Sequence, residues 1–137
     1  MEYKELAEEL LGNMILANKS KLLLKLSKIT HGEMFALQII DIHNSNITPG
    51  DISRIAGTTP ARIAAELKSL ENKGLITREI DSNNRRKIMV KLTPKGKMSA
   101  DEIRHEATQI AVEMLSRLGE CDAREYVRII GKLGGEG

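Results

Sequence analysis

The chain has 137 residues, of which 41% are hydrophobic and 29% are charged, as expected for a single domain with its own core. Its aromatic content of 2% disfavours the exposed ring platforms that bind single-stranded nucleic acid, and its one cysteine excludes an internal disulfide framework. The formal net charge is only +2, and the sequence predicts neither a signal peptide nor a run of about 18 apolar residues, so we expect a cytoplasmic protein.

The N-terminal third predicts two helices. Leu6, Leu10 and Met14 recur at helical spacing, which indicates one long helix from about Glu2 to Lys28. This segment is apolar on several faces, and we therefore expect part of it to pack on a second subunit. A second helix is predicted from Glu33 to His43.

Two short helices with the same start signal follow. Thr48 and Thr59 are capping residues, and each is followed by a proline that suits the first helical position. Gly57 ends the first helix and Gly74 ends the second. Two short helices joined by a tight glycine turn predict a helix-turn-helix.

The second of these helices is amphipathic. Ile63, Leu67 and Leu70 share one face. We predict that the opposite face presents a polar and small-residue set, which is Arg62, Ala65, Glu66, Ser69 and Lys73.

The stretch from Gly74 to Leu92 predicts an antiparallel hairpin. Ile88, Val90 and Leu92 alternate with polar or flexible residues, the period-2 pattern of a half-buried strand. The loop between the strands is polar and contains the adjacent pair Arg85 and Arg86. One of these arginines has a structural alternative, an ion pair with Asp81.

The C-terminal part predicts two more helices. Thr93 and Pro94 start a long helix that ends near Leu118, and Asp122 with Glu125 forms a capping box for a last helix.

Charge is unevenly distributed along the chain. Between Arg54 and Lys97 there are 11 basic and 4 acidic residues, a net charge of +7, and the remainder has a net charge of −5. A basic middle segment with acidic flanks indicates that a polyanion binds the middle of the chain.

The order of these elements and their residues resembles the MarR family of winged helix-turn-helix transcriptional regulators. The wing region of that family has a G-L-[IV]-x-R-x-x-D-x-x-D-R-R pattern followed by L-T-x-x-G. The chain matches it at Gly74, Leu75, Ile76, Arg78, Asp81, Arg85, Arg86, Leu92, Thr93 and Gly96. It departs at Asn84, where the family normally has an aspartate that holds the wing arginines.

The resemblance implies a mainly α fold with a small antiparallel β wing. It implies one MarR-like domain over residues 1–137, with a winged helix-turn-helix core at 30–96 and dimerisation helices at 1–29 and 97–137. We expect base or backbone contacts from the recognition helix, at Thr59, Pro60, Ala61, Arg62, Ala65, Glu66 and Ser69. Phosphate contacts are expected from Lys68, Lys73 and Lys87, and wing contacts from Asn83, Asn84, Arg85 and Arg86.

Function follows from the same resemblance. It implies a homodimer that binds double-stranded DNA at a palindrome and that represses transcription more often than it activates it. A small-molecule effector would bind in the crevice between the dimer helices and the recognition helix. No membrane partner and no cofactor is expected.

Two alternatives remain open from the sequence. The winged helix could serve protein–protein assembly, with the basic face merely solvated, or the three isolated histidines could meet in a metal-responsive regulator. Cys121 lies beside a predicted helix start, where a thiol sensor is a further option. An enzyme is not expected, because no phosphate loop, nucleophile elbow or acid–base pair is found.

Overall fold

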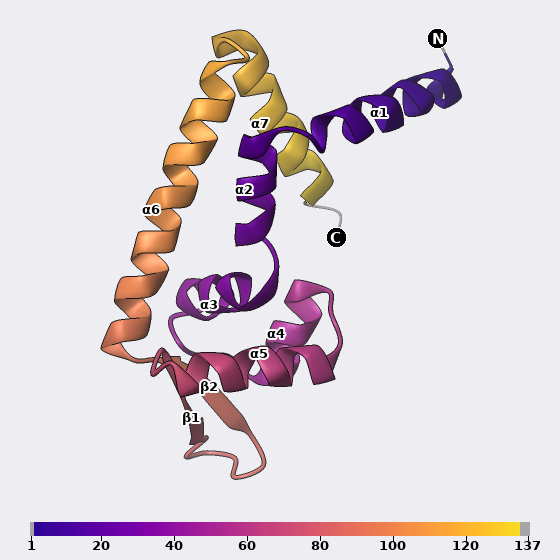
Figure 1. The fold of residues 1–137 in the computed structure, drawn as a ribbon. Helices are drawn as coiled ribbons and strands as arrows, with labels where there is room; N and C mark the ends of the chain where they lie inside the picture. Colours follow the sequence, from indigo (N-terminus) through magenta and orange to yellow (C-terminus); the bar gives the residue numbers. More distant parts are fainter. Residues whose placement is uncertain (1, 135–137) are drawn as a thin grey trace. The chain divides into compact units, whose positions relative to one another are not determined.

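The computed structural model describes residues 2–134, and its elements are shown in Figure 1. The helices and strands, in chain order, are α1 (Tyr3–Ala17), α2 (Lys21–Ile29), α3 (Gly32–Ile42), α4 (Pro49–Ala56), α5 (Pro60–Asn72), β1 (Ile76–Ile80), β2 (Ile88–Leu92), α6 (Pro94–Ser116) and α7 (Glu120–Gly134). The expectation of a mainly α fold with a small antiparallel wing is confirmed.

The chain forms two compact units. One is continuous, from residue 27 to residue 106, and contains α3, α4, α5, the hairpin and the first half of α6. The other combines residues up to 26 with those from 107 onward. Helix α6 continues from the first unit into the second.

The core of unit 27–106 lies among α3, α4, α5 and the inner part of the hairpin. Its largest fully buried side chains come from all of these elements and include Leu37, Ile40, Ile52, Leu67 and Val90. The hairpin pairs Ile76 with Leu92 and Ile80 with Ile88. Ile47 adds a single bridge to Val90.

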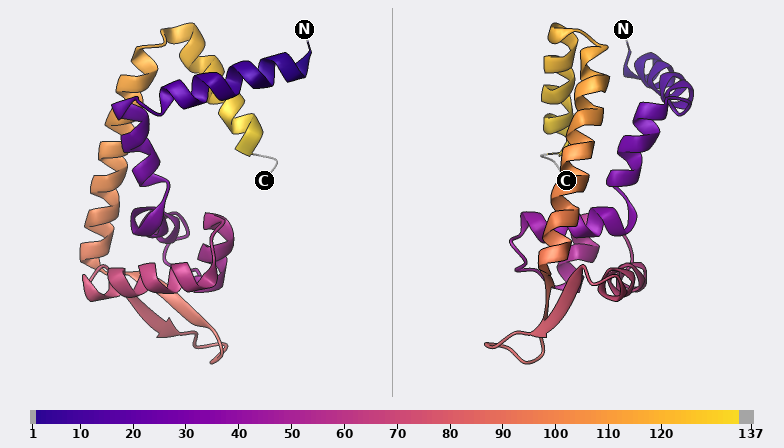
Figure 2. Two further views of the ribbon diagram at one scale, coloured as in Figure 1. Left: turned by 45° about the vertical axis from the view of Figure 1, so that its right-hand side comes forward. Right: turned by 60° about the vertical axis from the view of Figure 1, so that its left-hand side comes forward.

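The apolar stripe of the hairpin is buried only at its inner end. Val90 is fully buried, whereas Ile80 and Ile88 are exposed at the outer end. In both views of Figure 2 the hairpin loop projects away from the helices of this unit. This projection leaves the loop free to contact a partner.

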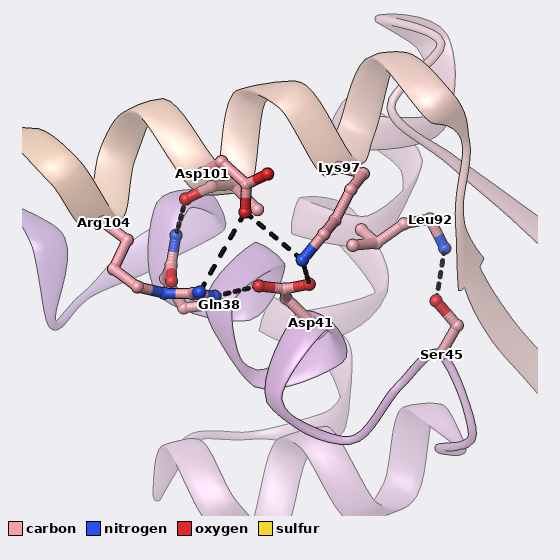
Figure 3. Close-up of polar contacts among 8 residues, drawn as sticks. Gln38, Asp41, Ser45, Leu92, Lys97, Asp101 and Arg104 are labelled. Atoms are coloured by element: carbon pink, nitrogen blue, oxygen red, sulfur yellow. Dashed lines mark hydrogen bonds and ion pairs between the residues drawn. The ribbon is translucent and has the colours of Figure 1, made fainter.

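A group of polar contacts fixes the start of α6 to α3 (Figure 3). Asp41 is 8% exposed, and its carboxylate binds the side chains of Lys97, at 2.8 Å, and of Arg104. Lys97 also pairs with Asp101, at 3.2 Å. The Gln38 side-chain amide donates a hydrogen bond to the carbonyl oxygen of Ala100, at 2.9 Å.

These contacts alter two pKa values. Burial alone would raise the pKa of Asp41, but hydrogen bonds from Lys97 and Arg104, together with their charges, lower it below its ordinary value. The hydrogen bond to Asp41 raises the pKa of Lys97. Both groups are therefore charged over the whole neutral range.

The structure corrects two helix boundaries. The single helix predicted from Glu2 to Lys28 is wrong, because Asn18 to Ser20 form a break between α1 and α2. At that break the Ser20 hydroxyl accepts a hydrogen bond from the backbone N–H of Leu23, at 3.4 Å, and so starts a new helix. The last helix begins at Glu120 rather than after a cap at Asp122.

Candidate nucleic-acid interface

The helix-turn-helix is held by local hydrogen bonds at each helix start. The Thr48 hydroxyl accepts from the backbone N–H of Asp51, at 3.1 Å, and the Thr59 hydroxyl accepts from that of Arg62, at 3.2 Å. Both predicted caps are confirmed. Gly57 adopts a φ of 65°, a left-handed conformation that suits glycine, and turns the chain from α4 toward α5.

Helix α5 has one buried and one exposed face. Ile63, Leu67 and Leu70 are buried, as predicted. The exposed face has Ala61 and Ala65 one turn apart, with Ala64 and Lys68 beside them. Ala64 is missing from the set predicted by the sequence, although the same helical periodicity indicates that it is accessible.

Arg62 and Glu66 lie one turn apart on the flank of α5. The Nε of Arg62 is 3.8 Å from a carboxylate oxygen of Glu66, and their side chains are 74% and 17% exposed. Glu66 is thus half-buried and not on the fully exposed face. Arg62 extends into solvent near the start of the helix, where a recognition helix contacts base edges.

Ser69 of α5 and Lys73, which directly follows α5, both have partners within the protein. The ammonium of Lys73 forms an ion pair with Glu33 of α3. Hydrogen bonds from Lys73 and from the half-buried Ser69 lower the pKa of Glu33. A phosphate contact by Lys73 would therefore compete with Glu33, whereas Lys68 is exposed and has no such partner in residues 2–134.

The wing loop is ordered by its own side chains. The Asp81 carboxylate accepts from the backbone N–H of Asn83, at 3.0 Å, and the Asn84 side-chain oxygen accepts from that of Arg86, at 3.1 Å. The backbone N–H of Lys87 donates to the carbonyl oxygen of Asn84, at 2.9 Å. Asn84 therefore serves the turn by hydrogen bonding.

The charges of the hairpin are divided between its strands and its loop. The cations of the strands have carboxylate partners. The Nε of Arg78 lies 3.8 Å from a carboxylate oxygen of Glu71 in α5, and the Nζ of Lys91 lies 3.0 Å from a carboxylate oxygen of Glu79. In the loop, Arg85 and Arg86 are exposed, and neither forms an ion pair with a carboxylate of residues 2–134. The alternative in which Asp81 holds one of them by charge does not occur in this structure.

A cavity of about 250 Å³ lies beside the start of α5. It is lined by the turn before α3, by the turn between α4 and α5, and by the flank of α5. Its polar side chains include Thr58, His31, Arg62 and Glu66. A molecule bound there would contact Arg62.

The histidines and the cysteine are not gathered into a candidate metal site within the part of the chain that the structure describes. No group of three His, Cys, Asp or Glu side chains suited to a metal ion is found in residues 2–134. The Nδ1 of His31 lies 2.8 Å from the carbonyl oxygen of Ser27, and the Nδ1 of His43 lies 2.8 Å from that of Ile39. Each of these histidines thus contacts the backbone at the end of the helix that precedes it. Cys121 is exposed and has no disulfide partner.

No helix in the described part of the chain combines the length and apolar character needed to cross a bilayer.

Comparisons with known proteins agree with this geometry. The family model "MarR family" matches residues 29–88, from the end of α2 to the start of β2. An uncharacterized HTH-type transcriptional regulator of Bacillus subtilis, YwhA, is 30% identical over 99 residues, which are 72% of this chain and 70% of that protein.

Two solved structures have the same fold. A MarR family protein from Bacillus stearothermophilus has a TM-score of 0.73 at 21% identity, over 99% of this chain and 97% of that one. The transcriptional repressor CouR, bound to a 23-mer DNA duplex, has a TM-score of 0.70 at 19% identity, over 98% of both chains.

Proposed function

This chain belongs to the MarR family of transcriptional regulators, and we propose that it is a homodimeric, ligand-responsive repressor that binds a palindromic operator. The main support is one arrangement within unit 27–106. An exposed recognition helix and a loop with two arginines that lack carboxylate partners in residues 2–134 belong to the same winged helix. Because a repressor acts on chromosomal DNA, we place it in the cytoplasm.

The wing provides attraction to DNA that does not depend on sequence. Arg85, Arg86 and Lys87 are adjacent, exposed cations, and Lys68 adds a further charge on α5. Arginine suits the narrow and negative minor groove, and all four residues can replace counterions on phosphates. Asn83 and Asn84 add polar groups to the same loop.

The recognition helix provides sequence preference. Arg62 is exposed near its start and is long enough for a bidentate contact to guanine. The small residues around it allow the backbone to approach the groove floor. Thr59, Pro60, Ser69 and Lys73 border this surface and are proposed as its backbone and rim contacts, whereas Glu66 could accept a hydrogen bond from a cytosine amine or simply pair with Arg62.

Dimerisation is supported by apolar surface on α1 and α7. Neither helix has a buried residue in the described chain, although both are rich in large apolar side chains. Ile15, Leu16 and Leu133 are each at least 66% exposed. Apolar area of this kind favours burial against a second copy of the same helices.

Response to a ligand is supported by the cavity beside α5. Its lining combines polar side chains with the apolar Phe35 and Ala56, and its volume of about 250 Å³ leaves room only for a small molecule. Since Arg62 lines the cavity, a bound molecule would compete with the contact of Arg62 to DNA.

The decisive experiment selects bound duplexes from a random pool with the full chain. We expect an enriched palindrome whose half-sites lie about one helical turn, or 10 bp, apart. Sedimentation of the complex should give two chains for each duplex. A reporter gene placed behind the selected site should then be repressed when the protein is expressed.

The same experiment separates this proposal from the assembly-module alternative. A winged helix that binds only protein would enrich no duplex. Its weak attraction to DNA would also lack sequence preference and would fall steeply as the salt concentration rises. Metal analysis of the purified protein tests the metal-responsive alternative.

A further inference from the structure

The exposed face of α5 is lined by alanine. Ala61 and Ala65 are one helical turn apart and lie opposite the buried Ile63 and Leu67. Ala64 is exposed about a quarter turn to one side. In this protein the centre of the recognition surface is therefore a row of methyl groups.

A methyl group can recognise only one feature of unmodified DNA. It neither donates nor accepts a hydrogen bond, so the amino, keto and ring nitrogen groups of the major groove provide no favourable contact to it. The thymine 5-methyl group is the apolar feature of that groove, and alanine is among the side chains that contact it. We propose that Ala61 and Ala65 recognise thymine methyl groups, which makes thymine the preferred base at the centre of each half-site.

The neighbours of the two alanines support this assignment. No side chain longer than a methyl group lies between Ala61 and Ala65 on this face, so the helix backbone can approach the bases closely. Polar side chains are confined to its edges, with Arg62 on one flank and Lys68 at the far end. The expected half-site is a short thymine tract next to a guanine that Arg62 contacts.

This inference rests on the proposed function, since it requires α5 to enter the major groove. The same chemistry has a second source, because 5-methylcytosine also presents a methyl group in the major groove. The experiment therefore includes both methylated bases. Thymine is the form present in an unmodified random pool.

The test uses the full chain and the best duplex recovered by selection. Each thymine of the half-site is replaced by uracil, which removes the methyl group and keeps every hydrogen-bonding group. For each thymine methyl group that touches an alanine, its removal should raise the dissociation constant about fourfold, as for one buried methyl group. Replacement by 5-bromouracil, whose bromine has a similar size, should restore the affinity.

A duplex with cytosine at the same position tests whether the methyl group of 5-methylcytosine is recognised as well. A duplex with cytosine at this position should bind more weakly than the one with thymine. Methylation of that cytosine at the 5-position should lower the dissociation constant about fourfold again, as for one buried methyl group. Methylation would then act through the alanines and not through the pairing groups of the base.

A matched pair of variants assigns the effect to residues. The double variant Ala61→Ser, Ala65→Ser replaces the two methyl groups with hydroxyl groups, which can form hydrogen bonds with any base. It should abolish the uracil penalty, which is the rise in the dissociation constant when thymine is replaced by uracil. Ala64→Ser makes the same substitution on the flank of the same helix and should leave that penalty unchanged. Thermal unfolding of each variant checks that the helix remains formed.

The outcomes distinguish failure of the proposed function from failure of the methyl assignment. If no duplex is enriched and none is bound, the proposed function fails and this inference fails with it. If a palindrome is bound but uracil binds as tightly as thymine at every position, the methyl assignment is overturned while the proposed function stands. A uracil penalty that persists in the double serine variant would also overturn it.

Discussion

Gly96 and Leu75 approach each other so closely that no other residue fits at position 96. A Cβ atom built on Gly96 would lie 1.9 Å from the carbonyl oxygen of Leu75. The same junction is fixed by Thr93, whose hydroxyl donates to the carbonyl oxygen of Gly74, at 2.6 Å, and accepts from the N–H of Gly96, at 3.0 Å. The L-T-x-x-G pattern thus joins the start of α6 to the end of α5 and the start of the wing.

Gly96→Ala should destabilise the protein by about 3 kcal/mol, near the upper end for overpacked sites, because the atom that it meets belongs to the backbone. Thermal or urea unfolding measures the change. Gly50→Ala is the control, since a Cβ there meets nothing closer than the Thr48 hydroxyl, at 3.9 Å. Equal stability of the two variants would contradict the close approach.

Asp41→Asn should lower stability at neutral pH by about 1–2 kcal/mol, because it removes a buried carboxylate whose cationic partners are half-exposed. The pKa of Asp41 is lowered in the folded state, so its contribution is present above the unfolded value of about 3.9. That contribution disappears as the pH falls through the folded value. Asparagine does not titrate.

The stability curves of the two proteins should therefore converge as the pH falls below about 4. Glu33 and Asp51 also have lowered pKa values, but they are present in both proteins and cancel in the comparison. A difference that stayed constant from pH 7 to pH 3 would show that Asp41 does not act through its charge.

Local signals in the sequence are sufficient to predict the helix-turn-helix. The caps at Thr48 and Thr59 and the stop at Gly57 depend on residues within four positions of each other, and all three occur as predicted. The winged fold follows from these caps and from the period-2 pattern of the second strand. The break at Asn18 to Ser20 is not predicted, because apolar residues continue at helical spacing on both sides of it.

Contacts between distant residues could not be predicted from the same patterns. Lys73 pairs with Glu33, 40 positions earlier, and Asp41 binds Lys97, 56 positions later. Neither pairing has a periodic signature. The burial of Glu66 likewise depends on how α5 packs on its neighbours, not on the residue type alone.

Arg85→Ala combined with Arg86→Ala should weaken binding to all duplexes alike and flatten the salt dependence. Each arginine that contacts phosphate contributes about one unit to the slope of log K against log salt, so the slope should fall by up to about 2. Fluorescence anisotropy between about 50 and 200 mM salt measures it. Arg128→Ala, on α7 and paired with Glu125, is the control. An unchanged slope would exclude the wing from the interface.

Asn84→Ala should weaken DNA binding without changing its salt slope. It removes the hydrogen bond to the backbone N–H of Arg86, worth about 0.5–1.5 kcal/mol, but keeps both arginines. Asn84→Asp keeps an acceptor at this position, so it should match the native protein once salt screens the added charge. If Asn84→Asp lowers the affinity at high salt as much as Asn84→Ala does, the turn does not depend on an acceptor at this position.

Arg62→Lys should weaken the selection for guanine at one position and leave the salt slope as it is. Lysine keeps the positive charge but lacks the planar fork that contacts guanine in a bidentate manner, so discrimination at one position should fall by about 1–3 kcal/mol. Selection from a random pool with the native chain and the variant measures this directly. Glu66→Gln is the control, because it removes the carboxylate 3.8 Å from Arg62 while the guanidinium stays in place, and it should retain the guanine preference. If the lysine variant selects the same guanine with the same strength, Arg62 binds the DNA backbone instead, and the preference for guanine arises elsewhere on α5.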